Sequence, residues 1–70
     1  MRYLIVIEGS ETGYGAYSPD LEGCVATGAT IDEVEATMRE AVEFHIDTLK
    51  AEGRDAPKPN AHVTYVEVNA

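Results

Sequence analysis

Two carboxylates in a short turn, Asp20 and Glu22, are the first side chains in the sequence that could act together in chemistry. Such a pair could serve as general acid and base or could bind a metal ion. Their context also has a simpler explanation, because Pro19 and Gly23 are turn residues and a turn aspartate can accept hydrogen bonds from backbone amides two residues on. A third role is to accept hydrogen bonds from Arg or Lys of a partner protein. The sequence alone leaves turn formation and partner binding open.

The other nucleophiles and metal ligands are isolated. Cys24 is the only cysteine, so no intrachain disulfide can form, and with His45 and His62 it matches none of the usual ligand spacings. Acidic Glu22 nearby would raise rather than lower the pKa of the Cys24 thiol, which disfavours a catalytic nucleophile. We therefore expect no metal and no cofactor, with Cys24 buried, His45 packed in a core or interface, and His62 exposed.

No other pattern indicates an enzyme. The glycines do not form a phosphate-binding spacing before a helix, and the serines and threonines lack the His and Asp partners of a nucleophile. A metal-dependent nuclease would need clustered carboxylates on its first strand and helix, and Glu8 is the only acidic residue near the first strand. We predict a protein without enzymatic activity.

Charge sets the class of partner. Five basic and thirteen acidic residues give a formal net charge of −8, which repels phosphate backbones and predicts no direct binding to nucleic acid. The same field would steer a basic protein toward this one, although an acidic surface also serves solubility alone. The longest apolar run, Tyr3–Ile7, is too short to span a bilayer and precedes no cleavage pattern, so we expect a cytoplasmic protein.

Four short stretches predict strands. Tyr3–Ile7 is apolar at every position, as expected for a central strand that is covered on both faces. Tyr14–Ser18 and Cys24–Thr27 follow, separated by turn residues, and His62–Val68 alternates well enough to be half buried.

One long helix is predicted between the third and fourth strands. Thr30 can cap its first turn, with Glu33 as the reciprocal partner of a capping box, and Gly53 can end it after about Glu52. Its core-facing positions recur every three or four residues: Ile31, Val34, Met38, Ala41, Val42, His45 and Leu49. The opposite side carries Asp32, Glu40, Glu43, Asp47 and Lys50. Beyond the helix, Pro57 and Pro59 enforce an extended linker.

This order, β-β-β-α-β, predicts an α+β fold with a mostly antiparallel sheet and one helix packed on one face. A right-handed crossover would place the last strand parallel to the first and beside it. The other sheet face then lacks cover, and Phe44, roughly 110° from the centre of the helix's apolar stripe, is also predicted to be exposed or at the core edge. With 70 residues the core is thin, so association with a partner or as a homodimer or higher oligomer is expected.

The chain as a whole resembles the HicB antitoxin family. The resemblance lies in the residues Pro19, Asp20, Leu21, Gly23, Cys24, Gly28 and Thr30. It extends to a Gly13–Tyr14 hairpin and to the exit from the helix through Gly53, Pro57 and Pro59. The sequence departs from the family at Ala29, where Asp is usual, and at His45, where an aromatic residue is frequent.

The resemblance implies a partial ribonuclease-H-like fold without the catalytic carboxylates. It implies a type II antitoxin that neutralises a small basic toxin of the HicA type, an mRNA-cleaving enzyme, by covering its active-site surface. Asp20, Glu22 and Phe44 are the candidate partner-binding residues. Many members add a C-terminal DNA-binding domain, and we expect a single HicB-like domain over residues 1–70 without one. Stand-alone members with no toxin gene beside them also exist, and a self-associating domain without a toxin partner remains the alternative.

Overall fold

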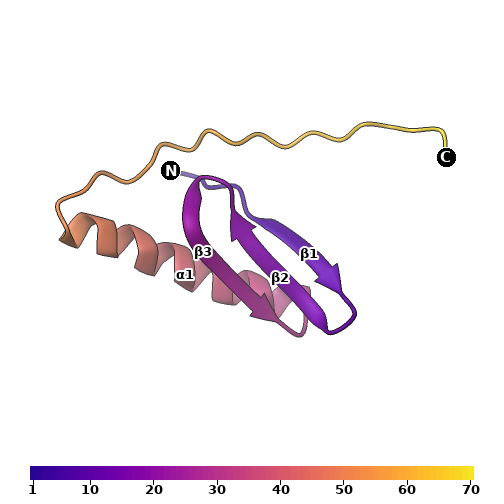
Figure 1. Cartoon of the computed structure of the whole chain (residues 1–70), viewed down its shortest axis with the longest axis horizontal. Coiled ribbons are helices and arrows are strands. Elements are labelled where there is room, and N and C mark those ends of the chain that lie inside the picture. Colours follow the sequence, from indigo (N-terminus) through magenta and orange to yellow (C-terminus); the bar gives the residue numbers. More distant parts are fainter.

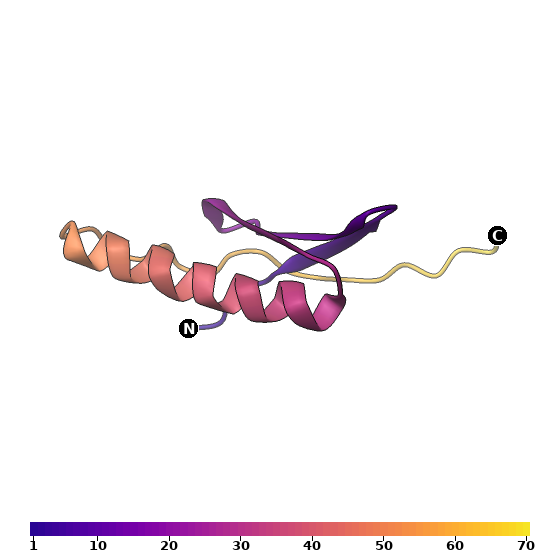
Figure 2. The ribbon, with the colours of Figure 1, turned by 90° about the horizontal axis from the view of Figure 1, so that it is seen from below.

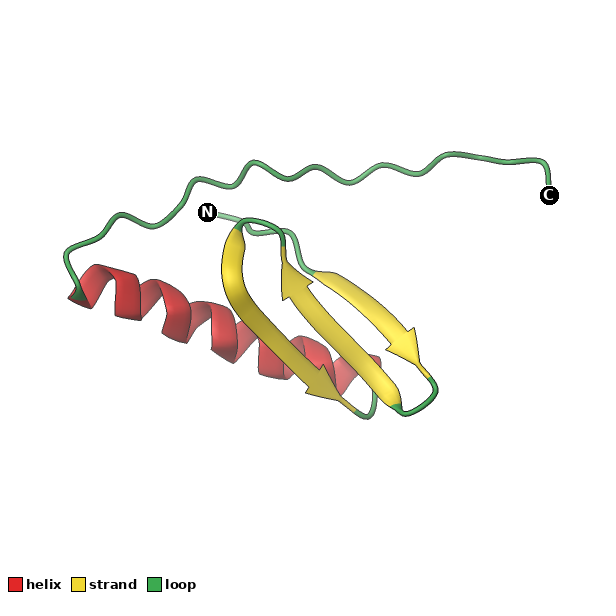
Figure 3. Cartoon of the chain, in the orientation of Figure 1, coloured by secondary structure: helices red, strands yellow, loops and turns green.

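A meander of three strands followed by one helix forms the folded part of the chain. The computed structural model describes residues 1–70 and contains strands β1 (Val6–Ser10), β2 (Gly13–Ser18) and β3 (Leu21–Gly28) and helix α1 (Ile31–Ala51). The strands form an antiparallel sheet in the order β1-β2-β3 (Figures 1 and 3). Helix α1 covers one face of that sheet, and residues 54–70 run past it without regular structure (Figure 2). The α+β class predicted from the sequence, with one helix on one face of an antiparallel sheet, is confirmed.

Turn chemistry sets the strand register. The β1–β2 hairpin pairs Val6 with Tyr17 and closes at Ser10 and Gly13, where the backbone φ of +147° requires glycine. The two-residue turn Pro19-Asp20 joins β2 to β3, and Ser18 pairs directly with Leu21. A bulge follows, because Tyr17 pairs with Val25 and leaves three residues of β3 without a partner.

Both ends of α1 are capped as the sequence predicts. The Thr30 hydroxyl accepts a hydrogen bond from the Glu33 amide at 3.1 Å, and the Glu33 carboxylate accepts one at 3.3 Å from the amide of Ala29, one residue before the cap. At the other end Gly53, at φ +73°, donates its amide to the carbonyl of Lys50. The helix is thereby fixed in length and in its position relative to β3.

The core lies between the sheet and α1. Its buried residues are Ala16, Leu21, Cys24, Ala26, Val34 and Met38. Close packing at the β3–α1 junction depends on Gly28, because a Cβ there would lie 2.8 Å from the backbone nitrogen of Val34. Helix α1 packs mainly on β3 and touches β1 least, so the flank of the helix beside β1 is poorly covered.

The first strand differs from its prediction. It begins at Val6 rather than Tyr3, and it lies at an edge of the sheet, while β2 is central. Extending the observed register would place Leu4 opposite Pro19, where β2 has already turned. An unbroken apolar run therefore marked the segment that packs against the core, not the extent of the strand.

The predicted last strand is also corrected. Residues 62–68 pair with no strand and their side chains are exposed, so the sheet has three strands and not four. On the helix, Ile31 at 49% exposure is not a core residue, whereas Ile46, which the predicted stripe omitted, packs against the core. His45 is half-buried, and the predicted acidic side of α1 is exposed as expected.

Candidate functional site

The turn between β2 and β3 holds the C-terminal linker. One carboxylate oxygen of Asp20 accepts the amide of Asn60 at 3.1 Å, and the other accepts the amide of Ala61 at 3.3 Å. The Tyr3 hydroxyl donates to the carbonyl of Pro57 at 2.6 Å in the same part of the molecule. Asp20 thus bonds amides about forty residues away, rather than the local turn amides that its position suggested.

Glu22 has no such partner. It begins the bulge of β3, is exposed, and makes no hydrogen bond or ion pair. The pair predicted from sequence therefore divides into Asp20, whose two oxygens are engaged within the chain, and Glu22, whose carboxylate faces solvent. Phe44, the remaining partner-binding residue predicted from the sequence, lies on another element, helix α1.

Phe44 is an exposed aromatic residue on an acidic helix face. Its side chain is 75% exposed, and Glu40 and Asp47, one turn before and after it, are exposed too. We call these three residues the Phe44 surface. A large apolar side chain between carboxylates offers apolar contact and charge attraction to a basic protein. The alternative of packing at the core edge does not apply to Phe44, because it is absent from the core cluster.

The other residues of the sequence motif build the fold. Leu21 is 1% exposed, and Gly23 adopts a positive φ of +80° inside the β3 bulge. Cys24 is buried as predicted, and burial, rather than the nearby Glu22, raises the pKa of its thiol above the ordinary value. A thiol held neutral and covered is a poor nucleophile.

The sheet face opposite α1 carries an apolar row. Val6, Tyr17 and Val25 are cross-strand neighbours on β1, β2 and β3, and Val25 is 66% exposed. The sequence predicts that this face is uncovered, and its apolar residues come from all three strands of the sheet. The alternation of buried Ala16 and Ala26 with exposed Tyr17 and Val25 was the available signal.

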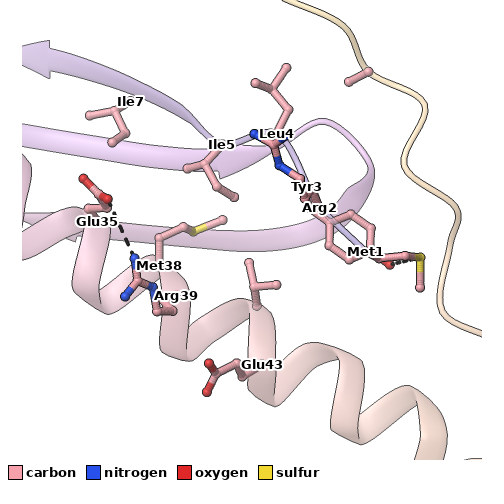
Figure 4. A pocket seen from close by; sticks show the side chains of 12 residues that line it. Met1, Arg2, Tyr3, Leu4, Ile5, Ile7, Glu35, Met38, Arg39 and Glu43 are labelled. Atoms are coloured by element: carbon pink, nitrogen blue, oxygen red, sulfur yellow. Dashed lines mark hydrogen bonds and ion pairs between the residues drawn. The ribbon is translucent and has the colours of Figure 1, made fainter.

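An open groove of about 760 Å³ lies beside β1, between the N-terminal residues and α1. Eight of its twelve lining residues are hydrophobic, and Ile5 and Met38 face each other across it (Figure 4). The rim carries Glu35 and Arg39, which form an exposed ion pair at 3.9 Å. We call this feature the β1 groove.

Metal chemistry finds no support in the arrangement of side chains. No three His, Cys, Asp or Glu side chains lie close enough together to hold an ion. Glu8, at an exposed position of β1, has no carboxylate cluster around it, and His62 is exposed. No helix of the structure has the length and apolar character needed to cross a membrane.

Comparison with known proteins places nearly the whole chain in one family. Residues 3–69 match the family model described as "HicB_like antitoxin of bacterial toxin-antitoxin system". A solved structure described as "HicA3 and HicB3 toxin-antitoxin complex" contains a chain that matches with a TM-score of 0.70 at 33% identity, over 86% of this chain and 70% of that one.

Curated relatives come from phage, bacteria and archaea. An uncharacterized 14.9 kDa protein of Haemophilus phage HP1 is 35% identical over 94% of this chain, and a UPF0150 protein of Helicobacter pylori is 40% identical over 67% of it. A UPF0150 protein of Thermoplasma acidophilum is 34% identical over 87% of the chain and is matched over 90% of its own length. The chain spans 50% of the phage protein and 65% of the Helicobacter protein.

Proposed function

Because the chain belongs to the HicB-like antitoxin family of bacterial toxin-antitoxin systems, we propose that it is an antitoxin that binds a small basic toxin of the HicA type. It neutralises the toxin by covering the active-site surface and excluding RNA. The observation that carries this proposal is the match to a chain from a HicA3–HicB3 complex at 33% identity and a TM-score of 0.70. Its own role is to bind, not to catalyse.

Charge supports a basic partner. The formal charge of −8 on 70 residues favours fast association with a positively charged protein and disfavours binding of RNA to this chain itself. Attraction of this kind weakens as salt screens it, with a Debye length of about 8 Å at physiological ionic strength.

The proposed contact residues are Phe44 and Glu22. Phe44 supplies an exposed anchor between carboxylates, and Glu22 supplies a carboxylate that no group within the chain engages. Asp20, the third partner-binding residue predicted from the sequence, contributes by holding the linker at Asn60 and Ala61, and so shapes the surface beside Glu22.

The test uses any small basic protein encoded by a gene that adjoins the gene of this chain. Purified toxin is incubated with an RNA substrate and increasing amounts of antitoxin, and RNA cleavage is measured together with the affinity of the complex. We expect cleavage to stop near stoichiometric antitoxin and the affinity to fall as salt rises. Full ribonuclease activity in the presence of excess antitoxin would refute the proposal.

Two substitutions locate the interface. Phe44→Ala should weaken the complex by about 2 kcal/mol, or roughly thirtyfold, if Phe44 is an interface anchor. Val25→Ala is the matched control, because Val25 is a similarly exposed apolar residue on the opposite layer. An unchanged affinity of Phe44→Ala would remove Phe44 from the interface while leaving the antitoxin role itself intact.

A second candidate function is self-association without a toxin. The observation that favours it is the exposure of four large apolar side chains in the C-terminal segment, at 64% or more each. A chain that remains monomeric at high concentration would exclude this alternative. The measurement uses the chain alone, so its result is independent of the toxin assay.

A further inference from the structure

The C-terminal residues 62–68 have the composition of a strand but no strand partner. Val63, Tyr65, Val66 and Val68 are exposed by 64%, 92%, 79% and 75%. They account for four of the nine large hydrophobic residues that the chain exposes. We call residues 62–68 the apolar tail. Such a segment, extended and apolar, is a template for pairing with a sheet edge.

The sheet offers a free edge of the matching kind. Strand β1 pairs with β2 on one side only, because the sheet order ends at β1. Beside that edge lies the β1 groove, where the half-buried side chains of Ile5 and Val42 leave apolar surface uncovered between the sheet and α1. A fourth strand placed next to β1 would pair its backbone groups and cover the groove in one step.

The chain's own apolar tail does not occupy this place. Asp20 holds Asn60 and Ala61, and Ala61 is the last residue that touches the groove. Beyond it the chain extends past the β1–β2 hairpin and away from the sheet (Figures 1 and 2). The radius of gyration of 13.9 Å reflects this, since a compact domain of this length has about 11 Å.

We infer that the apolar tail of each copy pairs with β1 of a second copy, forming a strand-exchanged dimer. In a two-fold symmetric dimer, the apolar tail of each copy pairs with β1 of the other copy. The same contact therefore forms twice, and it covers both tails and both β1 grooves. The local charges permit it, because the tail carries only Glu67 and the first seven residues carry only Arg2 among Asp, Glu, Lys and Arg. The inference does not depend on toxin binding.

Solution mass is the first measurement. Sedimentation equilibrium of the full chain should give twice the chain mass of 7.6 kDa at micromolar to millimolar concentrations. The dimer should persist at high salt, unlike a complex held by opposite charges. A mass of one chain throughout that range would overturn the inference.

Cysteine cross-linking distinguishes exchange from folding back. In a Cys24→Ala background, one batch of protein carries Val6→Cys on β1 and another carries one tail substitution, Val63→Cys, Tyr65→Cys, Val66→Cys or Val68→Cys. Neighbouring strands bring Cα atoms within the range a disulfide spans, so mixing the batches should give a covalent pair of unlike copies for at least one tail position. If instead a chain carrying both cysteines closes on itself as a monomer, the tail completes its own sheet and the inference is wrong.

Proline substitutions test the backbone pairing. Successive residues of a strand direct their amides to opposite sides, so either Tyr65→Pro or Val66→Pro removes a donor to β1. One of the two should weaken dimerisation at least tenfold, whereas Asn69→Pro, just outside the apolar tail, should not. Helix content by circular dichroism verifies that each variant is folded. Unchanged dimerisation in both tail variants would contradict strand pairing.

Discussion

Asp20→Asn tests whether the β2–β3 turn holds the linker. The two carboxylate oxygens accept the amides of Asn60 and Ala61 at 3.1 and 3.3 Å. Hydrogen bonds to charged groups contribute about 1.5–3 kcal/mol when well formed, and partial exposure here reduces each to about 1 kcal/mol. Asparagine has the same shape but retains one carbonyl acceptor and turns an amide group against a backbone N–H. The substitution should therefore release the linker locally at a cost of about 1–2 kcal/mol.

Amide hydrogen exchange measures this release residue by residue. A loss of about 1.4 kcal/mol of local protection corresponds to roughly tenfold faster exchange, which we expect at Asn60 and Ala61. Amides of α1 should change little, because its caps do not involve Asp20. Glu22→Gln is the matched control, two residues away and without any partner, and should alter stability by less than about 0.5 kcal/mol.

The result that would refute the reasoning is equal exchange at Asn60 and Ala61 in the native protein and in Asp20→Asn. The hydrogen bonds would then contribute nothing to the position of the linker. Asp20 would return to the role first suggested by sequence, a carboxylate available to a partner, and its effect should then be seen in toxin affinity instead.

Three further predictions concern stability. Thr30→Ala should lower the free energy of unfolding by about 1 kcal/mol in urea titration, because the Glu33 amide loses its acceptor. Met38→Ala, at a residue only 1% exposed, should cost about 2–5 kcal/mol, comparable with the whole stability of about 3–5 kcal/mol typical of a domain this small. Circular dichroism at 25 °C should therefore show a largely unfolded protein, while exposed Phe44→Ala changes stability by less than about 0.5 kcal/mol. Burial raises the pKa of Cys24, so the contribution of its neutral thiol is fully present below the ordinary value of 9.0 and is lost as pH rises through the higher folded pKa. Urea midpoints measured from neutral to alkaline pH should fall less steeply in Cys24→Ala than in the native chain, and parallel curves would contradict this.

Local chemistry made the helix predictable. Thr30, Glu33 and Gly53 lie within a few residues of the backbone groups that they satisfy, so residue type and spacing were sufficient to place both ends of α1. The burial of Cys24 was also predicted, whereas the bulge at Gly23 was not, because residues 19–23 read equally well as one turn.

Long-range relations were not predictable in the same way. An apolar run such as Tyr3–Ile7 records burial, which packing against α1 provides without strand pairing, so the run could not reveal that β1 begins at Val6. The link from Asp20 to Asn60 and Ala61 joins residues about forty positions apart, and no pattern in sequence connects them. Helical periodicity indicated that Phe44 could be exposed, but only the structure showed that Phe44, Glu40 and Asp47 are all exposed and form the Phe44 surface.

The meander topology has a kinetic consequence. Every strand pair joins consecutive elements, and α1 packs on the β3 strand that immediately precedes it, so residues 1–51 can fold through contacts between chain neighbours, a condition associated with rapid folding. The hydrogen bonds of greatest sequence separation, from Tyr3 to Pro57 and from Asp20 to Asn60 and Ala61, can form only after that unit exists. The sheet and helix can therefore fold before the linker and the apolar tail are placed, and the folded unit then presents the free edge of β1 that another copy can use.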